Sequence, residues 1–270
     1  MKLLFENWRN YLNEDEEEAQ KKEFLALLQQ KRQERKKVLP EYLKEQDEVT
    51  VEPIDRELPV GQIYCDMDGV LADFAGGLLD LVHDELKNIE LIKDLSVGVV
   101  AIAGKFEYDL KMLKARLQEK QAGRQDPNEW DESQRLADQY IEETEGLNLW
   151  ESLFENLPML PAGAALWQLI GPYGVTILTG APGGSGVLYA KVKWIERNLR
   201  PPPKHVIKQS DKRPYATEES GKPNLLIDDW SHNIEGWRAN KGIAVQFDEA
   251  DSQANLQAVS AILVPEKDKK

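Results

Sequence analysis

The sequence is short of the residues that would mark a secreted, membrane-spanning or zinc-binding protein. Its single cysteine, Cys65, excludes an internal disulfide and favours a reducing compartment. The three histidines are too scattered to give the ligand spacing of a zinc site. No apolar run approaches the roughly 20 residues of a membrane helix, and residues 1–12 lack the unbroken apolar stretch of a signal peptide. We therefore expect a cytoplasmic protein with no membrane partner.

Basic residues are also in deficit, with 34 lysines and arginines against 48 aspartates and glutamates. Proteins that bind a nucleic-acid backbone usually gather lysine and arginine on one face. Here the one basic run, Lys31–Lys37, is interrupted by Gln33 and Glu34. Long nucleic acid is therefore not an expected partner. A small phosphorylated substrate bound through a metal ion remains compatible, because the ion offsets the negative field locally.

Residues 1–58 predict a helical, partly disordered extension and linker that precede a main domain at 59–270. Apolar residues recur at helical spacing at positions 4, 8 and 12, and again at positions 24, 27 and 28. Beyond Leu39-Pro40 the sequence is polar as far as Pro53. Two interpretations stay open: a solvated extension, or a helix that docks a protein partner.

From Gly61 onward, short β-rich runs alternate with amphipathic helices, which predicts an α/β fold with a Rossmann-like parallel sheet. The predicted helices of this layer are Ala164–Ile170, Val187–Asn198 and Ile234–Ala239. The predicted strands are Gln62–Cys65, Val175–Leu178, His205–Ile207, Asn224–Ile227 and Ile243–Phe247.

About 100 residues separate the first two strands, far more than one crossover helix needs. Three stretches within this gap have a helical pattern: Asp84–Leu95, Glu107–Lys120 and Ser133–Glu145. We therefore expect a helical cap, inserted at about residues 84–150, above a site on the sheet.

Chemically active residues follow four of the predicted strands. They are Asp66 and Asp68, then Thr179-Gly180, then Asp211-Lys212, and finally Asp228-Asp229. Parallel sheets bind ligands at the carboxyl ends of their strands, so these loops should converge at one edge.

The pair Asp66 and Asp68 ends an apolar strand and is followed by Gly69. In strand geometry both carboxylates point the same way. Two carboxylates that close repel each other, which raises one pKa or recruits a cation. The glycine permits a sharp turn, and Asp228-Asp229 adds hard oxygen ligands suited to Mg²⁺.

A Ca²⁺-binding loop is the main competing interpretation of this aspartate pair. It would need further acidic positions and a closing glutamate after the glycine. Val70, Leu71 and Ala72 occupy that space instead. The order of the four segments, each after a predicted strand, therefore favours a catalytic site.

These segments resemble the motifs of the haloacid dehalogenase superfamily, over Gly61 to about Phe247. The segment Asp66–Phe74, with the letters DMDGVLADF, is similar to the 5′(3′)-deoxyribonucleotidase branch, and so are Leu157–Pro161, Ile177–Pro182 and Leu225–Asp229. Residues 5–14 resemble the leaders of some tailed-phage proteins, which implies the cytoplasm of a host cell.

The resemblance implies that Asp66 attacks phosphorus and forms an aspartyl-phosphate. Asp68 would protonate the leaving oxygen and then deprotonate the attacking water. Mg²⁺ would be held by Asp66, the backbone carbonyl of Asp68 and Asp228, with Asp229 acting through water or as a further ligand.

The resemblance also implies that Thr179 and Gly180 bind the transferring phosphoryl group and that Phe74 lines the substrate pocket. A lysine should neutralise the charge shared by the nucleophile and the phosphate. Lys212 lies where the family places this lysine, and Lys208 and Lys222 are nearby competitors.

The function that follows is a Mg²⁺-dependent phosphomonoester hydrolase, a 5′-nucleotidase acting on nucleoside or deoxynucleoside monophosphates. One alternative keeps the mechanism but acts on a sugar phosphate or on a terminal phosphate of a nucleic acid. The other is a non-catalytic interaction or structural protein that retains the fold and is recruited through residues 1–58.

Overall fold

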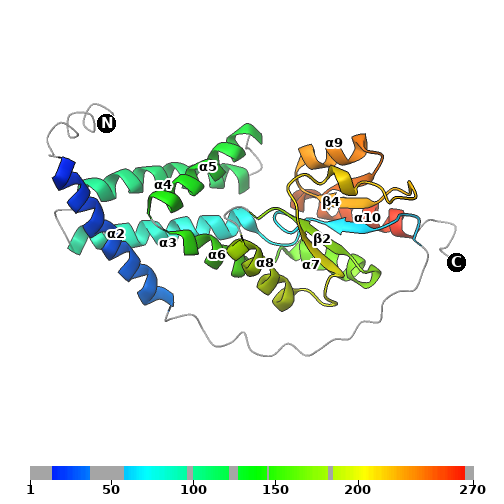
Figure 1. Cartoon of the computed structure of the whole chain (residues 1–270), viewed down its shortest axis with the longest axis horizontal. Coiled ribbons are helices and arrows are strands. Elements are labelled where there is room, and N and C mark those ends of the chain that lie inside the picture. Colours follow the sequence, from blue (N-terminus) through cyan, green and yellow to red (C-terminus); the bar gives the residue numbers. More distant parts are fainter. Residues whose placement is uncertain are drawn as a thin grey trace. The chain divides into compact units, whose positions relative to one another are not determined.

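The computed structural model describes residues 14–36, 58–95, 100–121, 127–144, 146–181 and 185–264 (Figure 1). The chain forms two compact units. The first unit contains helix α2 (Glu14–Lys36) and the described part of Leu78–Leu147. The second unit contains the described parts of Asp47–Gly77 and Asn148–Lys270. The expected boundaries at residues 58 and 59, and at 84 and 150 for the insert, stay a prediction. The apolar positions 4, 8 and 12 lie outside the described residues.

A five-stranded parallel sheet forms the centre of the second unit, in the order β3-β2-β1-β4-β5. Each strand agrees with a predicted one to within one residue at either end, which confirms the α/β class with a Rossmann-like sheet. The strands are β1 (Ile63–Cys65), β2 (Thr176–Thr179), β3 (His205–Lys208), β4 (Leu225–Asp228) and β5 (Ile243–Gln246).

Helices cover both faces of this sheet, with α9 (Ser231–Ala239) and α7 (Pro161–Ile170) on opposite sides (Figure 1). All four residues of β2 and all four of β4 are buried, as a sheet covered on both faces requires. The unit is completed by α8 (Ser185–Asn198) and α10 (Ser252–Leu263).

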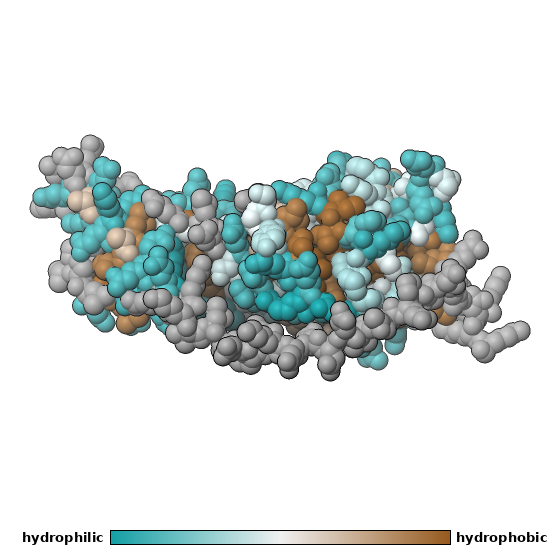
Figure 2. Space-filling model, turned by 60° about the horizontal axis from the view of Figure 1, so that its bottom comes forward, coloured by the Kyte–Doolittle hydropathy of each residue, from teal (hydrophilic) through white to brown (hydrophobic). Residues whose placement is uncertain are grey.

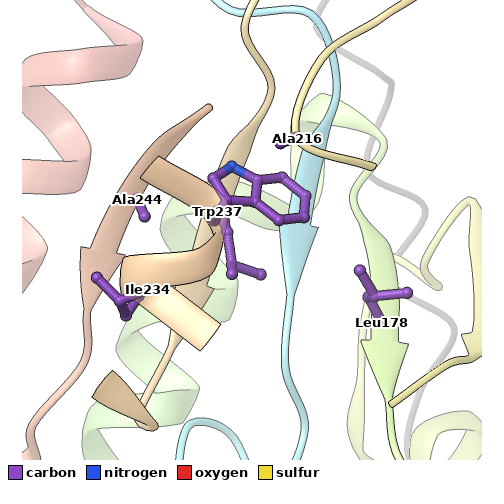
Figure 3. Close-up of a cluster of buried hydrophobic side chains, with 6 residues drawn as sticks. Leu178, Ala216, Ile234, Trp237 and Ala244 are labelled. Atoms are coloured by element: carbon purple, nitrogen blue, oxygen red, sulfur yellow. The ribbon is translucent and has the colours of Figure 1, made fainter. Parts of the chain in front are cut away.

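Trp237 organises the core on the α9 face of the sheet. Figure 3 shows its indole reaching from α9 over the strands, in a cluster with Ile234, Ala244 and Leu178. The indole N–H donates to the carbonyl of Asn224 at 3.1 Å, so its polar group is satisfied in the core. This packing fixes α9, and with it the loop that joins β4 to α9.

The segment Leu157–Pro161 pairs with the loop that follows β1. The amide of Asp73 donates to the carbonyl of Pro158 at 2.8 Å, and the amide of Leu160 donates to the carbonyl of Leu71 at 2.9 Å. A Cβ on Gly163 of α7 would lie 2.6 Å from the carbonyl oxygen of Val70, so α7 approaches the loop more closely than any other residue type allows. These contacts hold the loop after Asp68 in place.

Asp73 also starts α3 (Phe74–Leu95), because its Oδ1 accepts a hydrogen bond from the amide of Gly76 at 2.7 Å. This is the contact of an N-cap with the third helical residue. The helix begins ten residues before the predicted Asp84, and Gly76 and Gly77 lie within its first turn.

The first unit is helical and includes α2. From Leu78 on, α3 is joined by α4 (Val100–Gln121) and α5 (Pro127–Glu143), and α6 (Leu147–Glu155) begins where the unit ends. Phe24 of α2 stacks on Phe106 at a centroid distance of 5.2 Å. The described part of residues 1–58 therefore packs on helices of this chain.

The described surface is largely hydrophilic in the space-filling view, with apolar areas between the polar ones (Figure 2). Among the described helices, none combines the length and the apolar character that crossing a bilayer requires.

Candidate active site

Three carboxylates meet at the carboxyl edge of the sheet. Asp66 follows β1, Asp228 ends β4, and Asp229 comes next in the chain; each offers an oxygen within 4.8 Å of the others'. Strands β1 and β4 are neighbours, and the strand order changes direction between them. Open parallel sheets form their ligand crevices at this kind of switch point. Residues 162 positions apart in the sequence thus share one site.

Lys212 bridges two of these carboxylates. Its Nζ lies 2.9 Å from Asp66 Oδ2 and 2.6 Å from Asp228 Oδ2, and its side chain is 4% exposed. The two competing lysines lie elsewhere: Lys208 is exposed at the end of β3, and Lys222 donates to the carbonyl of Leu58 at 2.8 Å. Of the three candidates, Lys212 is the one with the geometry to neutralise a charge on Asp66.

Asp228 is fully buried and heavily bonded. Its Oδ1 accepts from the amide of Trp230 at 2.9 Å, and its Oδ2 accepts from the side-chain amide of Asn233 at 3.0 Å. Burial, and next the negative charge of Asp66, raise the pKa of Asp228 to about 6, although Lys212 opposes the shift. Burial alone would lower the pKa of Lys212, but the charges of Asp66 and Asp228 outweigh it and raise that pKa.

Asp68 follows the nucleophile candidate by two residues, but its side chain has a different partner. The ammonium group of Lys191, on α8, donates to Asp68 Oδ2. Burial raises the pKa of Asp68, and the charge of Asp66 adds to the effect against the attraction of Lys191. Oδ1 of Asp68 is buried and has no hydrogen-bond partner among the described residues.

Thr179 and Gly180 end β2 beside this pair. Thr179 is fully buried, and its Oγ1 accepts a hydrogen bond from Lys191 Nζ at 3.0 Å. No described atom lies within 4 Å of the position that a Cβ on Gly180 would take, so its backbone faces open space. A hydroxyl and an open backbone next to a carboxyl group suit the oxygens of a phosphoryl group.

The residues present fit a small, hard divalent cation. Gly69 has a φ of +73°, and a Cβ there would lie 2.2 Å from Asp229 Oδ2, so the turn gives this carboxylate room. Three clustered carboxylates are the oxygen donors that Mg²⁺ prefers. Burial, and next the charge of Asp66, raise the pKa of Asp228, and a bound cation would oppose both effects by stabilising the ionised carboxylate. The side chain of Asp68 is outside this cluster, so its proposed ligand atom is the backbone carbonyl.

Phe74 lies in a buried aromatic cluster beside the site. Its ring stacks on Phe154 at 5.4 Å and on Trp150 at 6.2 Å, and the residue is 8% exposed. Its role in lining a substrate pocket stays a prediction.

Lys191 is the site residue that the sequence reasoning missed. It shares a helical stripe with Val187, Ala190, Trp194 and Ile195, all of them buried. A lysine at an apolar position of an amphipathic helix is the signal that could have found it, since lysine is almost never fully buried unless paired.

No protein-family model and no curated protein matches the sequence. Among solved structures, a hydrolase from Streptococcus pneumoniae TIGR4 is similar at 15% identity and a TM-score of 0.40, over 75% of this chain and 98% of the other. A phosphonoacetaldehyde hydrolase-like protein from Oleispira antarctica is similar at 16% identity and a TM-score of 0.34, over 80% of this chain and 87% of the other. A dehalogenase is similar at 14% identity and a TM-score of 0.36, over 69% and 84%.

Proposed function

We propose that this protein is a Mg²⁺-dependent phosphomonoester hydrolase of the haloacid dehalogenase type, with Asp66 as the nucleophile. One observation carries the proposal: the carboxylate of Asp66 is ion-paired with Lys212 at 2.9 Å and has Asp228 and Asp229 within ligand distance of a shared cation. Surface carboxylates rarely share a buried lysine and two further acids at the end of a parallel strand.

In the first half of the proposed reaction, a carboxylate oxygen of Asp66 attacks phosphorus and the bond from phosphorus to the ester oxygen breaks. Asp68 gives its proton to the departing oxygen, so the alcohol leaves neutral. Burial raises the pKa of Asp68, which is the direction that this role requires, because a general acid must carry a proton. Lys212 stabilises the negative charge that Asp66 shares with the phosphoryl group.

In the second half, a water molecule attacks the phosphorus of the aspartyl-phosphate and Asp68 takes up its proton. Inorganic phosphate leaves, and the carboxylate of Asp66 is restored. The carboxylates of Asp66, Asp228 and Asp229 and the backbone carbonyl of Asp68 would hold Mg²⁺. When bound, the ion would stabilise the negative charge of the phosphoryl oxygens. Thr179 and Gly180 would orient the same oxygens.

The proposed substrate is a nucleoside or deoxynucleoside monophosphate. Its support is the sequence resemblance of Asp66–Phe74 and of the three later segments to the deoxyribonucleotidase branch. The acidic balance of the chain supports a small substrate over a nucleic-acid end, since a net charge of −14 repels a polyanion. The inserted helices would act as the cap. A protein partner of residues 1–58 would have to bind parts of this stretch other than the face of α2 that packs on Phe106 and Glu85.

Phosphate release tests the proposal directly. The full chain is incubated with Mg²⁺ and nucleoside monophosphates, sugar phosphates or 3′-phosphorylated oligonucleotides. We expect release from the monophosphates, its loss with EDTA, and a fall on the order of 10³-fold or more in Asp66→Asn. The control is Asp251→Asn, an exposed aspartate in the same unit. Unchanged turnover in Asp66→Asn would exclude the mechanism, and release only from sugar phosphates or oligonucleotides would reassign the substrate. A wild-type protein inert on every substrate would favour a non-catalytic role.

A further inference from the structure

Lys191 is a fully buried lysine whose ammonium group has three polar partners. It donates to Asp68 Oδ2, to Thr179 Oγ1 at 3.0 Å and to the carbonyl oxygen of Gly180 at 2.6 Å. An ammonium group has three N–H donors. All three donors are therefore used by residues of two neighbouring segments, the loop after β1 and the end of β2 with the residue that follows it.

The surroundings of this ammonium group hold it in place. Its Nζ lies 4.5 Å from the centroid of the Phe154 ring, and the neighbouring residues of its own helix face are apolar. A buried charge is strongly unfavourable unless it is paired and hydrogen-bonded. The three acceptors and the face of the Phe154 ring offset the cost of burying the ammonium charge. Another position of the side chain would therefore leave this charge without partners.

Asp68 is the partner on which this contact has a chemical effect. An ammonium group that donates to Oδ2 needs an unprotonated acceptor there, so a proton carried by Asp68 must sit on Oδ1. That oxygen is the one without a hydrogen-bond partner among the described residues. The contact therefore fixes the oxygen of Asp68 on which a proton can sit, and with it the orientation of the carboxyl group.

We propose that Lys191 is a positioning residue that aligns the acid–base carboxyl group of Asp68 with the phosphoryl-binding turn at Thr179-Gly180. The inference rests on the proposed phosphohydrolase function. In each turnover Lys191 keeps its own protons: the proton that moves to the leaving oxygen, and the one taken from water, both pass through the carboxyl group of Asp68. Lys191 acts by holding that carboxyl group beside the turn at Thr179-Gly180.

Leaving-group dependence separates this role from simple support of the fold. An alkoxide leaving group, as in a nucleoside monophosphate, needs protonation as it departs, whereas p-nitrophenolate does not. The value of kcat/KM covers the steps up to departure of this group, so the variants are compared by kcat/KM on a nucleoside monophosphate and on p-nitrophenyl phosphate.

For Lys191→Met we expect kcat/KM on the nucleoside monophosphate to fall on the order of 10²-fold or more, and less than about tenfold on p-nitrophenyl phosphate. Lys193→Met is the matched control: it lies on the same helix with a side chain 41% exposed, and should change neither value. Lys191→Arg keeps the charge but changes the donor geometry, and should show the same selective loss if Lys191→Met does not fold.

A double-variant cycle shows whether Lys191 acts through its partner. In the background of Asp68→Asn, adding Lys191→Met should change kcat/KM on the nucleoside monophosphate by no more than a few-fold, because the acid that it aligns is already gone. An equal loss on both substrates, an effect confined to KM, or multiplicative losses in the double variant would overturn the inference while leaving the phosphohydrolase proposal intact. A wild-type protein that hydrolyses neither ester would overturn the proposed function, and the inference with it.

Discussion

The ionised form of Asp228 should destabilise the metal-free protein as pH rises. Its pKa lies at about 6 in the folded chain against an ordinary value of 3.8. The folded state therefore binds more protons than the unfolded state between these values, so stability is lost as pH rises from about 4 through 6 and stays low above. The shift is about two pKa units, and at about 1.4 kcal/mol per unit the loss reaches about 3 kcal/mol. The attraction of Lys212 is already contained in this shift, because it opposes the larger effects of burial and Asp66.

Asp228→Asn keeps the shape of the protonated side chain but cannot ionise, so the fall in stability with rising pH should disappear. In EDTA at pH 7.5 we expect the variant to be more stable than the wild type by up to about 3 kcal/mol, with the difference vanishing near pH 4. Urea unfolding followed by tryptophan fluorescence measures it, because five of the seven tryptophans lie in the second unit. Mg²⁺ should stabilise the wild type and not the variant.

Asp251→Asn, at an exposed position, is the control and should leave the pH profile unchanged. A variant less stable than the wild type at pH 7.5 without metal would refute the reasoning, and so would a stability difference that does not depend on pH.

Three further predictions follow from the backbone and from the helical unit. Gly69→Ala should lower Mg²⁺ affinity at least tenfold in calorimetric titration, because its Cβ would meet the carboxylate of Asp229, a proposed ligand. Gly221→Ala is the control: Gly221 also has a positive φ, but no described atom lies within 4 Å of its Cβ position, so only the backbone cost of about 1–2 kcal/mol is expected. Gly163→Ala should destabilise the second unit by about 1–3 kcal/mol in urea unfolding, because its Cβ would lie against the backbone of Val70 and Leu71 in the loop after β1. Arg32→Met should destabilise the first unit by about 3–5 kcal/mol, measured by hydrogen exchange in α2, because the charge of buried Glu85 loses its cation and keeps only the hydrogen bonds from Tyr140 and Asn88. Adding Glu85→Gln should restore part of the loss.

The sheet and the carboxylate cluster were predictable because both follow from local signals. Each strand is an apolar run ended by a polar or glycine-rich turn, and a parallel sheet brings the carboxyl ends of its strands to one edge whatever the length of the connections. That rule predicted that the loops carrying Asp66, Lys212 and Asp228 meet, and the structure shows Asp66 beside Asp228 across 162 residues. The choice of Lys212 over Lys208 and Lys222 came from the family resemblance. The start of α3 was missed because Gly76 and Gly77 weaken the helical pattern, and the capping contact of Asp73 that offsets them is a matter of side-chain geometry.

The contacts that could not be predicted from the sequence are made by lysine and arginine side chains on the buried, apolar faces of helices. Lys191 follows Val187 and precedes Trp194 on the buried face of α8, and Arg32 continues the buried stripe of Phe24 and Leu28 on α2. A sequence pattern shows that such a cation faces the interior but does not identify the carboxylate that pairs with it. The partners, Asp68 and Glu85, lie 123 and 53 residues away. These partners are visible only in the tertiary structure. The ion pair of Arg32 with Glu85 shows that α2, which by its sequence could have been a solvated extension, belongs to a folded unit.

The charges of the candidate site explain why a divalent cation suits it. With all four carboxylates of Asp66, Asp68, Asp228 and Asp229 ionised, these groups and the two ammonium groups of Lys191 and Lys212 leave a formal charge of minus two, and a proton on Asp68 reduces it to minus one. A phosphate monoester brings further negative charge, so its approach to a metal-free site is opposed by the carboxylates that would perform the chemistry. One Mg²⁺ would offset this negative charge and leave the two lysines with separate proposed tasks, Lys212 beside the proposed nucleophile and Lys191 beside the proposed acid. Replacing Lys212 should therefore impair the attack by Asp66, and replacing Lys191 should impair protonation of the leaving oxygen by Asp68. A site with a single lysine shared by both carboxylates could not separate these two effects.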